Sequence, residues 1–150
     1  MAFKSSVSVI KGTNFKKMVK EGIELIGGMK SIVKQGDRIL LKPSIPVLRP
    51  PESGMISDLR ILEVLIELAN EANVDEILIV ESSATIDLDQ DDELQEILRR
   101  TGAKAVDLNK ISDADIITVK VPKHLVWEEI PIPRLILDSD ILINIPKLKT

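Results

Sequence analysis

The sequence contains no cysteine and no tyrosine, and it has one histidine, one tryptophan and two phenylalanines among its 150 residues. Without thiols the chain forms no disulfide and supplies no thiolate to an iron–sulfur cluster. A zinc site, which usually takes several His or Cys ligands, is disfavoured for the same reason. Proteins that bind single-stranded nucleic acid stack bases on aromatic side chains, so the few aromatics and the net charge of −4 argue against nucleic acid as a partner.

Long apolar runs and targeting features are also missing. No apolar stretch approaches the roughly 20 residues that a membrane-spanning helix needs. The first residues run directly into polar serines and not into the apolar core of a signal peptide. We therefore expect a cytoplasmic protein that does not have a membrane as its partner.

The apolar residues that are present come mainly from Ile, Leu and Val, and the apolar fraction is 44%. Such aliphatic segments are typical of parallel strands that are buried on both faces. Charge is divided along the chain. Residues 1–50 hold ten Lys/Arg against three Asp/Glu, and residues 51–145 hold eight against twenty-one. Solvated helix faces explain most of these charges.

Three strand–helix–strand units, a hairpin and a final strand are predicted along the chain. The expected strands are 6–10, 38–41, 77–80, 105–108, 116–121, 129–132 and 140–145, and the expected helices are 14–26, 57–73 and 91–100. Ser57 is the expected N-cap of the second helix. No helix fits between 121 and 129, which favours an antiparallel hairpin. The predicted fold class is α/β, a three-layer Rossmann-like sandwich whose mostly parallel sheet has an antiparallel hairpin addition.

Residues 1–150 are expected to form a single α/β domain. The chain stops just after the last predicted strand, before any crossover that would cover this strand. We therefore expect the domain to be the amino-terminal part of a longer architecture.

Polar loops follow the carboxyl ends of the predicted parallel strands, which is where open α/β sheets bind ligands. Lysine ammonium groups and helix N-termini attract anions, and hydroxyl groups donate hydrogen bonds to them. The predicted ligand-binding residues are Lys42, Ser44, Ser57, Asp58, Glu81, Ser82, Ser83, Lys147, Lys149 and Thr150. Taken singly, each has an ordinary structural explanation, as a strand-end lysine, a turn former or an exposed tail. The prediction requires lysines far apart in sequence to meet in one pocket.

Sharper motifs are missing from the chain. It has no glycine-rich dinucleotide fingerprint and no P-loop. Residues 87–92 imitate the start of an EF-hand loop, but the sixth position is Asp92 and the twelfth is Leu98, so we interpret them as carboxylates at a helix N-terminus. The single histidine, His124, falls in the hairpin loop. No nucleophile–base pair is therefore predicted, no catalytic residue is assigned, and no metal site is expected.

Four segments in order, residues 9–12, 26–28, 36–43 and 145–150, resemble the domain of unknown function 362 family. The most specific parts are two lysine-bearing loops. Lys42-Pro43-Ser44 stands where the family has Lys-Pro-Asn, and residues 146–150 match its Pro-Lys-Leu-Lys-Thr, which the family continues with histidine. Members are typically longer, and many carry ferredoxin-like iron–sulfur modules. The resemblance implies an amino-terminal portion with no cofactor of its own and an iron–sulfur cluster in the missing portion or in a partner.

Two functions stay open at this point. The first is an anion-binding domain, for a small phosphate or carboxylate ligand, in an iron–sulfur-associated protein with redox chemistry as one option. The alternative is a non-catalytic interaction or oligomerisation module that docks through the open sheet edge at 140–145. Its partner would be a second copy or the missing carboxyl-terminal half.

Overall fold

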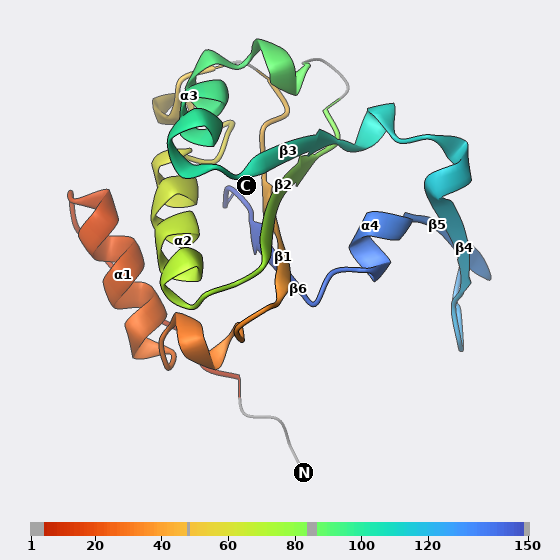
Figure 1. Ribbon diagram of the computed structural model, residues 1–150, viewed down its shortest axis with the longest axis horizontal. Helices are drawn as coiled ribbons and strands as arrows, with labels where there is room; N and C mark the ends of the chain where they lie inside the picture. Colours follow the sequence, from red (N-terminus) through yellow and green to blue (C-terminus); the bar gives the residue numbers. More distant parts are fainter. Residues whose placement is uncertain (1–4, 48, 84–86, 149–150) are drawn as a thin grey trace.

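A four-stranded parallel sheet forms the centre of the computed structural model, which describes residues 5–47, 49–83 and 87–148 (Figure 1). The strand order is β3-β2-β1-β6. The bounds are β1 (Arg38–Pro43), β2 (Glu76–Glu81), β3 (Lys104–Asp107) and β6 (Ile141–Ile145). All three strand pairs are parallel. The carboxyl ends of the four strands therefore lie along one edge of the sheet.

Helices cover the two faces of this sheet unequally (Figure 1). One face carries α1 (Phe15–Leu25), α2 (Arg60–Glu71) and α3 (Asp92–Thr101), and the other carries the single turn α4 (Arg134–Leu137). Side chains alternate along β1, so Ile39 and Leu41 join the core under the long helices, and Leu40 joins the smaller cluster beside α4. The predicted Rossmann-like α/β fold is confirmed.

Helices α1 and α3 begin and end within one residue of the predicted ranges 14–26 and 91–100. Asn14 accepts a hydrogen bond from the backbone of Lys17 at 2.9 Å, and Asp91 accepts one from Leu94 at 3.0 Å. Gly102 ends α3 with a φ of 72°, a conformation that glycine adopts without strain. The interpretation of the acidic run as helix-terminal carboxylates is therefore confirmed. Among the described residues, no group of His, Cys, Asp or Glu could hold a metal ion.

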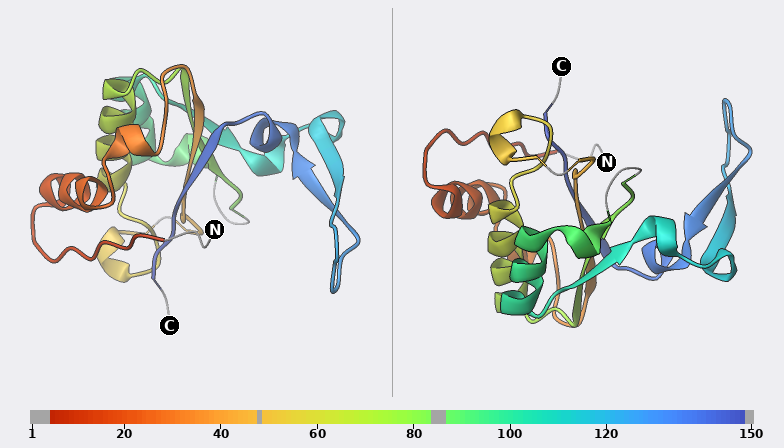
Figure 2. Two further views of the ribbon diagram at one scale, coloured as in Figure 1. Left: turned by 90° about the horizontal axis from the view of Figure 1, so that it is seen from below. Right: turned by 90° about the horizontal axis from the view of Figure 1, so that it is seen from above.

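The predicted hairpin is present, but it is separate from the main sheet. β4 (Ile116–Lys120) and β5 (Glu129–Pro133) pair antiparallel and form their own two-stranded sheet. Figure 2 shows this hairpin as an arm that extends away from the body of the molecule. The expected addition to the main sheet is therefore an independent arm, joined to β6 through α4.

The predicted first strand at residues 6–10 is wrong. This segment is irregular, and Val9 is 89% exposed. Ser8 donates its hydroxyl hydrogen bond to the carbonyl of Gly22 at 2.8 Å, so the segment lies against α1 and not in the sheet. Alternating valines favour an extended backbone, but a strand also needs a neighbouring strand, and β6 occupies the edge beside β1. Two strand–helix–strand units remain of the three predicted.

The helices in the described part of the chain are short. None of them combines the length and the apolar composition that crossing a bilayer requires.

Candidate ligand-binding cleft

Ser57 joins the end of β6 to the loop that follows β1. Its hydroxyl donates to the carbonyl of Ile145 at 2.6 Å and accepts from the backbone N–H of Ser44 at 3.0 Å. The predicted role of Ser57 as the N-cap of α2 is wrong, because the helix begins at Arg60 and the N-cap residue is Leu59. The buried Ser57 instead satisfies backbone groups of two separate segments, and so fixes the carboxyl end of β6 against the start of α2.

Asp58 and Arg60 form an ion pair at the start of α2. Both carboxylate oxygens of Asp58 accept from the guanidinium, at 2.8 and 2.5 Å, and one of them also accepts from the backbone N–H of Arg60. The guanidinium lies over the ring of Phe15, 3.9 Å from its centroid. A guanidinium held by two parallel hydrogen bonds and an aromatic face has little freedom to turn. Arg60 therefore presents a fixed positive group beside the end of β6.

These residues line a cleft of about 390 Å³ at the carboxyl edge of the sheet. Lys147, two residues beyond the end of β6, lines it together with Ser57, Asp58 and Arg60. The apolar part of the lining comes from Phe15, Pro51, Ile61, Ile145 and Pro146, and Glu52 adds a second carboxylate. The cleft thus combines an apolar floor with a few charged groups, which is the usual composition of a small-molecule site.

The ion pair makes the contribution of Asp58 to the free energy of unfolding depend on pH. Its hydrogen bonds from Arg60 hold the pKa of Asp58 below the ordinary value of 3.8. The stabilisation is therefore complete above the unfolded-state pKa and is lost as the pH falls through the lower folded-state pKa. We expect the free energies of unfolding of the unmodified chain and of Asp58→Asn to differ most near neutral pH and to converge below about pH 4. Urea unfolding across this range would measure it, and a constant gap would contradict the assignment.

Lys42 and Glu81 form a second group at the same edge. The Lys42 ammonium lies 3.0 Å from one carboxylate oxygen of Glu81, whose side chain is 6% exposed. The backbone N–H of Ser82 donates to the same oxygen at 2.8 Å, and that of Ile45 donates to the other at 2.9 Å. Every charge of this group therefore has a partner within the protein. The group holds the loops in position, and this structural role accounts for it without a ligand.

The remaining predicted residues are spread over the edge. Ser83 is buried, and its hydroxyl donates to the carbonyl of Pro46 at 3.1 Å, so it ties together the loops after β1 and β2. The side chain of Asn109 donates to the Ser83 carbonyl at 2.7 Å and adds the loop after β3. Lys149 and Thr150 lie outside the described residues.

The predicted single pocket for both lysines is divided in two. Lys42 follows Leu40 on the α4 face of β1, whereas Ile145, which pairs with Pro43, belongs to the core under the long helices. Lys147 lines the cleft on that helical side, and Lys42 is not among its lining residues. The structure thus brings together Ser57, Asp58 and Lys147, with Ser44 bonded to Ser57, and places Lys42 with Glu81 and Ser82.

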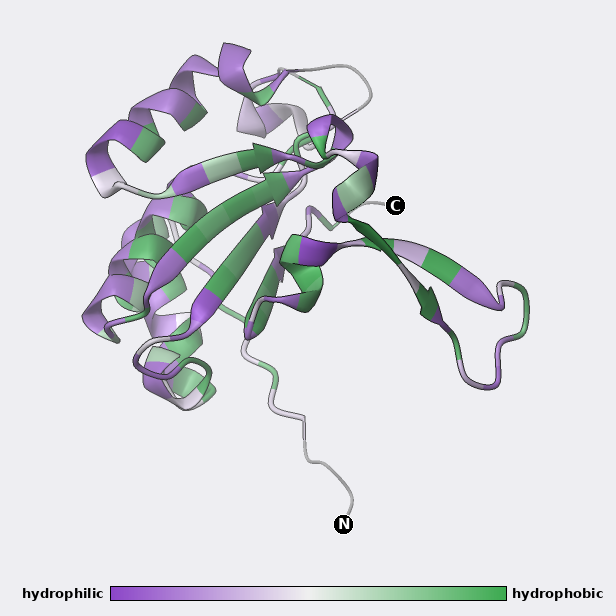
Figure 3. Ribbon diagram, turned by 45° about the vertical axis from the view of Figure 1, so that its right-hand side comes forward, coloured by the Kyte–Doolittle hydropathy of each residue, from purple (hydrophilic) through white to green (hydrophobic). Residues whose placement is uncertain are grey.

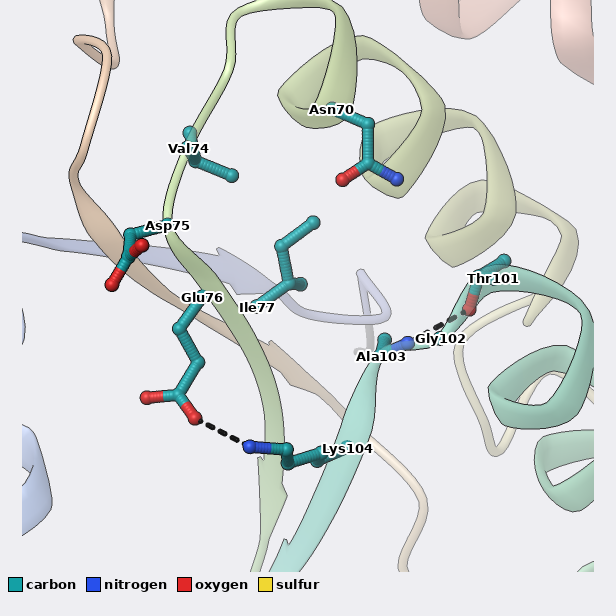
Figure 4. Close-up of a pocket in the computed structure, with 9 residues that line it drawn as sticks. All are labelled: Asn70, Val74, Asp75, Glu76, Ile77, Thr101, Gly102, Ala103 and Lys104. Carbon is teal, nitrogen blue, oxygen red and sulfur yellow. Dashed lines mark hydrogen bonds and ion pairs between the residues drawn. The ribbon is translucent and has the colours of Figure 1, made fainter.

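Another hollow of about 380 Å³ lies at the opposite, amino end of the strands, between the end of α2 and the start of β3 (Figure 4). Its main polar feature is the ion pair of Lys104 with Glu76, 2.9 Å long, which lowers the pKa of Glu76. Arg38 binds the other carboxylate oxygen. Ligands of open α/β sheets bind at the carboxyl ends of strands, so this hollow is a weaker candidate.

Comparison with known families agrees with the resemblance that the lysine-bearing loops indicated. The family described as Domain of unknown function (DUF362) matches residues 39–150. The chain belongs to this family. Comparisons with the curated proteins and with the solved structures gave no match.

The DUF362 match includes β1 from Ile39 onward, Ser57, Asp58 and Lys147, but it begins after α1. Phe15 therefore reaches the cleft from a helix that precedes the matched region. Sequence reasoning missed both Phe15 and Arg60. The spacing of Asp58 and Arg60 at a helix start was a usable signal for the ion pair, because a carboxylate there commonly accepts from the backbone two residues later. No local pattern indicated Phe15, which contacts Arg60 through the packing of α1 against α2.

Proposed function

We propose that this DUF362 domain binds a small anion, a phosphate or a carboxylate, in the cleft at the carboxyl edge of its parallel sheet. The observation that carries the proposal is the position of Lys147, in a cleft whose other cation, Arg60, is already fixed by Asp58 and Phe15. Among the described residues Lys147 forms no direct ion pair, although its charge helps to lower the pKa of Asp58, and its ammonium group can therefore still bind a ligand. The location agrees with the rule that places ligands beyond the carboxyl ends of strands.

The charge balance of the lining makes Lys147 decisive. Asp58 and Arg60 neutralise each other, which leaves Lys147 and Glu52 as the other charged groups of the cleft. Removing Lys147 therefore turns a balanced lining into a negative one that repels anions. Lys42 is not expected to contribute directly, because its ammonium binds Glu81.

We expect Lys147→Ala to bind inorganic phosphate and short-chain carboxylates at least tenfold more weakly than the unmodified chain, a difference of about 1.4 kcal/mol. Calorimetric titration with each anion and thermal shift of the free protein measure this. Lys30→Ala, at an exposed lysine in the short 3-10 helix Met29–Ser31, is the matched control and should bind normally. Failure of the unmodified chain to bind any of these anions, or equal binding by Lys147→Ala, would remove the proposal.

We also propose that the domain works within an iron–sulfur-associated protein. The support is the resemblance of its loops to a family in which many members carry such modules. The chain has no cysteine, so the cluster ligands must come from another segment or another protein. Iron and acid-labile sulfide in the complex isolated from the native source would support this, and their absence from that complex would count against it.

The second candidate is an interaction module that docks through β6. This strand lies at the edge of the sheet, and Leu142 is half exposed on it. An aliphatic edge strand with unpaired backbone groups is a surface on which another strand can add. A Leu142→Lys substitution should abolish such docking while leaving anion binding in the cleft intact, which separates the two candidates.

A further inference from the structure

The two edges of the β4–β5 hairpin differ in their hydrogen-bonding groups. The backbone N–H of Val121 donates to the carbonyl of Glu128 at 2.8 Å, in line with the register that pairs Lys120 with Glu129. Bonded and non-bonded pairs alternate in an antiparallel ladder. Residues 117 and 119 therefore bond to β5, and the N–H and C=O groups of residues 116, 118 and 120 point away from it, along the outer edge of β4.

Prolines close the corresponding edge of β5. Pro131 lies opposite Thr118 and Pro133 lies opposite Ile116, both at non-bonded positions. Their nitrogens face the outer edge of β5 and carry no hydrogen, so this edge cannot accept a further strand along its length. The outer edge of β4 has no proline, and among its groups named above only the N–H of Ile116 has a partner within the described residues, the carbonyl of Asp113. The hairpin can thus add a strand on one side only.

One face of the hairpin is aliphatic. The register pairs Ile117 with Ile132 and Val119 with Ile130, and these four side chains lie on the same face. The arm projects from the body of the molecule with hydrophobic segments on both strands (Figure 3). Beyond the strands, Trp127 is 71% exposed at the tip. An isolated two-stranded hairpin is marginal in water, so this arm gains stability from further strands.

The charges along β4 indicate which kind of strand pairs with its outer edge. Asp113 and Asp115 precede the strand, and Lys120 and Lys123 lie at its end and just beyond it. A parallel copy of β4 would place like charges side by side. An antiparallel copy places the acidic end of each strand beside the basic end of the other. This complementarity favours a second copy of the same chain.

We propose that β4 pairs antiparallel with β4 of a second copy, about a twofold axis through Thr118. In this register Ile116 lies opposite Lys120 of the second copy, whose N–H can donate to the carbonyl of Ile116. Ile117 lies beside Val119 of the second copy, so the two aliphatic faces join into one across four strands. The interface is isologous and closes on itself, as in most homodimers.

Sedimentation velocity over a wide concentration range tests the proposal with the whole chain. We expect a concentration-dependent dimer, and we expect Thr118→Pro to be monomeric. The N–H that this proline removes points to the outer edge, so the pairing with β5 is retained, as it is at Pro131 on the opposite strand. Circular dichroism should match that of the unmodified chain, and the thermal unfolding midpoint should match that of the unmodified chain at concentrations too low for it to dimerise.

Charge reversal tests the same β4–β4 interface without introducing a proline. Asp113→Lys and Lys123→Asp should each weaken self-association at least tenfold. Mixed together, the two variants should form a heterodimer, because each then meets an opposite charge at both ends of the paired strands. Aspartate also suits residue 123, whose φ is 56°.

Leu142→Lys, on the exposed edge of the main sheet, is the matched control and should still dimerise. The proposal is overturned by an unmodified chain that stays monomeric at all concentrations. It is equally overturned by a dimer that survives Thr118→Pro or by mixed charge variants that fail to associate.

Discussion

Replacing Glu81 with alanine is expected to lower the free energy of unfolding by roughly 3 kcal/mol, the cost of leaving buried hydrogen-bonding groups without partners. The carboxylate accepts from the backbone of Ile45 and Ser82 and binds the ammonium of Lys42. The Ile45 N–H lies in the buried interior, and alanine provides no acceptor for it. Because Ile45 starts the loop that leads to Ser57, we also expect weaker anion binding in the cleft.

Equilibrium unfolding in urea measures this loss, and Glu76 offers a control on the same strand. Glu76 begins β2 and binds Arg38 and Lys104, but it is more exposed, and an exposed ion pair contributes up to about 1 kcal/mol. Glu76→Ala should therefore cost much less than Glu81→Ala. Equal losses for the two variants would show that Glu81 has no special part in holding the loops.

A double-mutant cycle would separate the contribution of Lys42 from that of the backbone donors. Lys42→Met removes the ammonium but keeps most of the apolar stem, and the side chain is already 36% exposed. We expect this variant to lose less stability than Glu81→Ala, since the two backbone donors still bind the carboxylate. The coupling energy between the two substitutions then reports the ion pair itself.

The other large effect is expected at Ile79, in the middle of β2. Its side chain is fully buried in the core between the sheet and the long helices, and the strand has neighbours on both sides. Ile79→Ala should cost about 3–4 kcal/mol, from lost apolar burial and the cavity that remains. Urea unfolding with an unchanged slope would identify a loss of stability and not a change of unfolded state.

Leu142→Ala is the comparison for Ile79→Ala, because Leu142 also lies on a strand of the same sheet. It is half exposed at the edge, so its removal leaves no enclosed cavity, and we expect a loss below about 1 kcal/mol. Similar losses at the two positions would mean that β6 is covered in solution. Association through the β6 edge would be the physical explanation of that result.

Most of the fold could be predicted because local and long-range signals agree. Aliphatic runs at β1, β2 and β6 predicted parallel strands, and the predicted ranges 14–26 and 91–100 agree with α1 and α3. Residues 6–10 failed because alternation reports a preference for extended backbone but not the presence of a neighbouring strand. The independence of the hairpin from the main sheet was equally invisible, since it depends on where α4 directs the chain.

The position of the candidate site in the fold could be predicted, but the set of residues that form it could not. The crevice rule indicated the carboxyl edge of the sheet, and Ser57, Asp58 and Lys147 do line one cleft there. The same rule could not indicate that Lys42 would be bound by Glu81, because both follow strand ends and their pairing depends on loop paths. Phe15 contributes through helix packing, which no sequence spacing encodes.

The position of β6 beside β1 has a consequence for how the chain is made. The backbone N–H of Arg38 donates to the carboxylate of Asp140, a contact between residues 102 positions apart. On the ribosome β1 therefore emerges long before the strand that completes its second edge. Until then the growing polypeptide exposes one edge of an aliphatic strand to solvent, and contacts of such long sequence separation form slowly. Synthesis of β6 is accordingly the step that covers this second edge of β1.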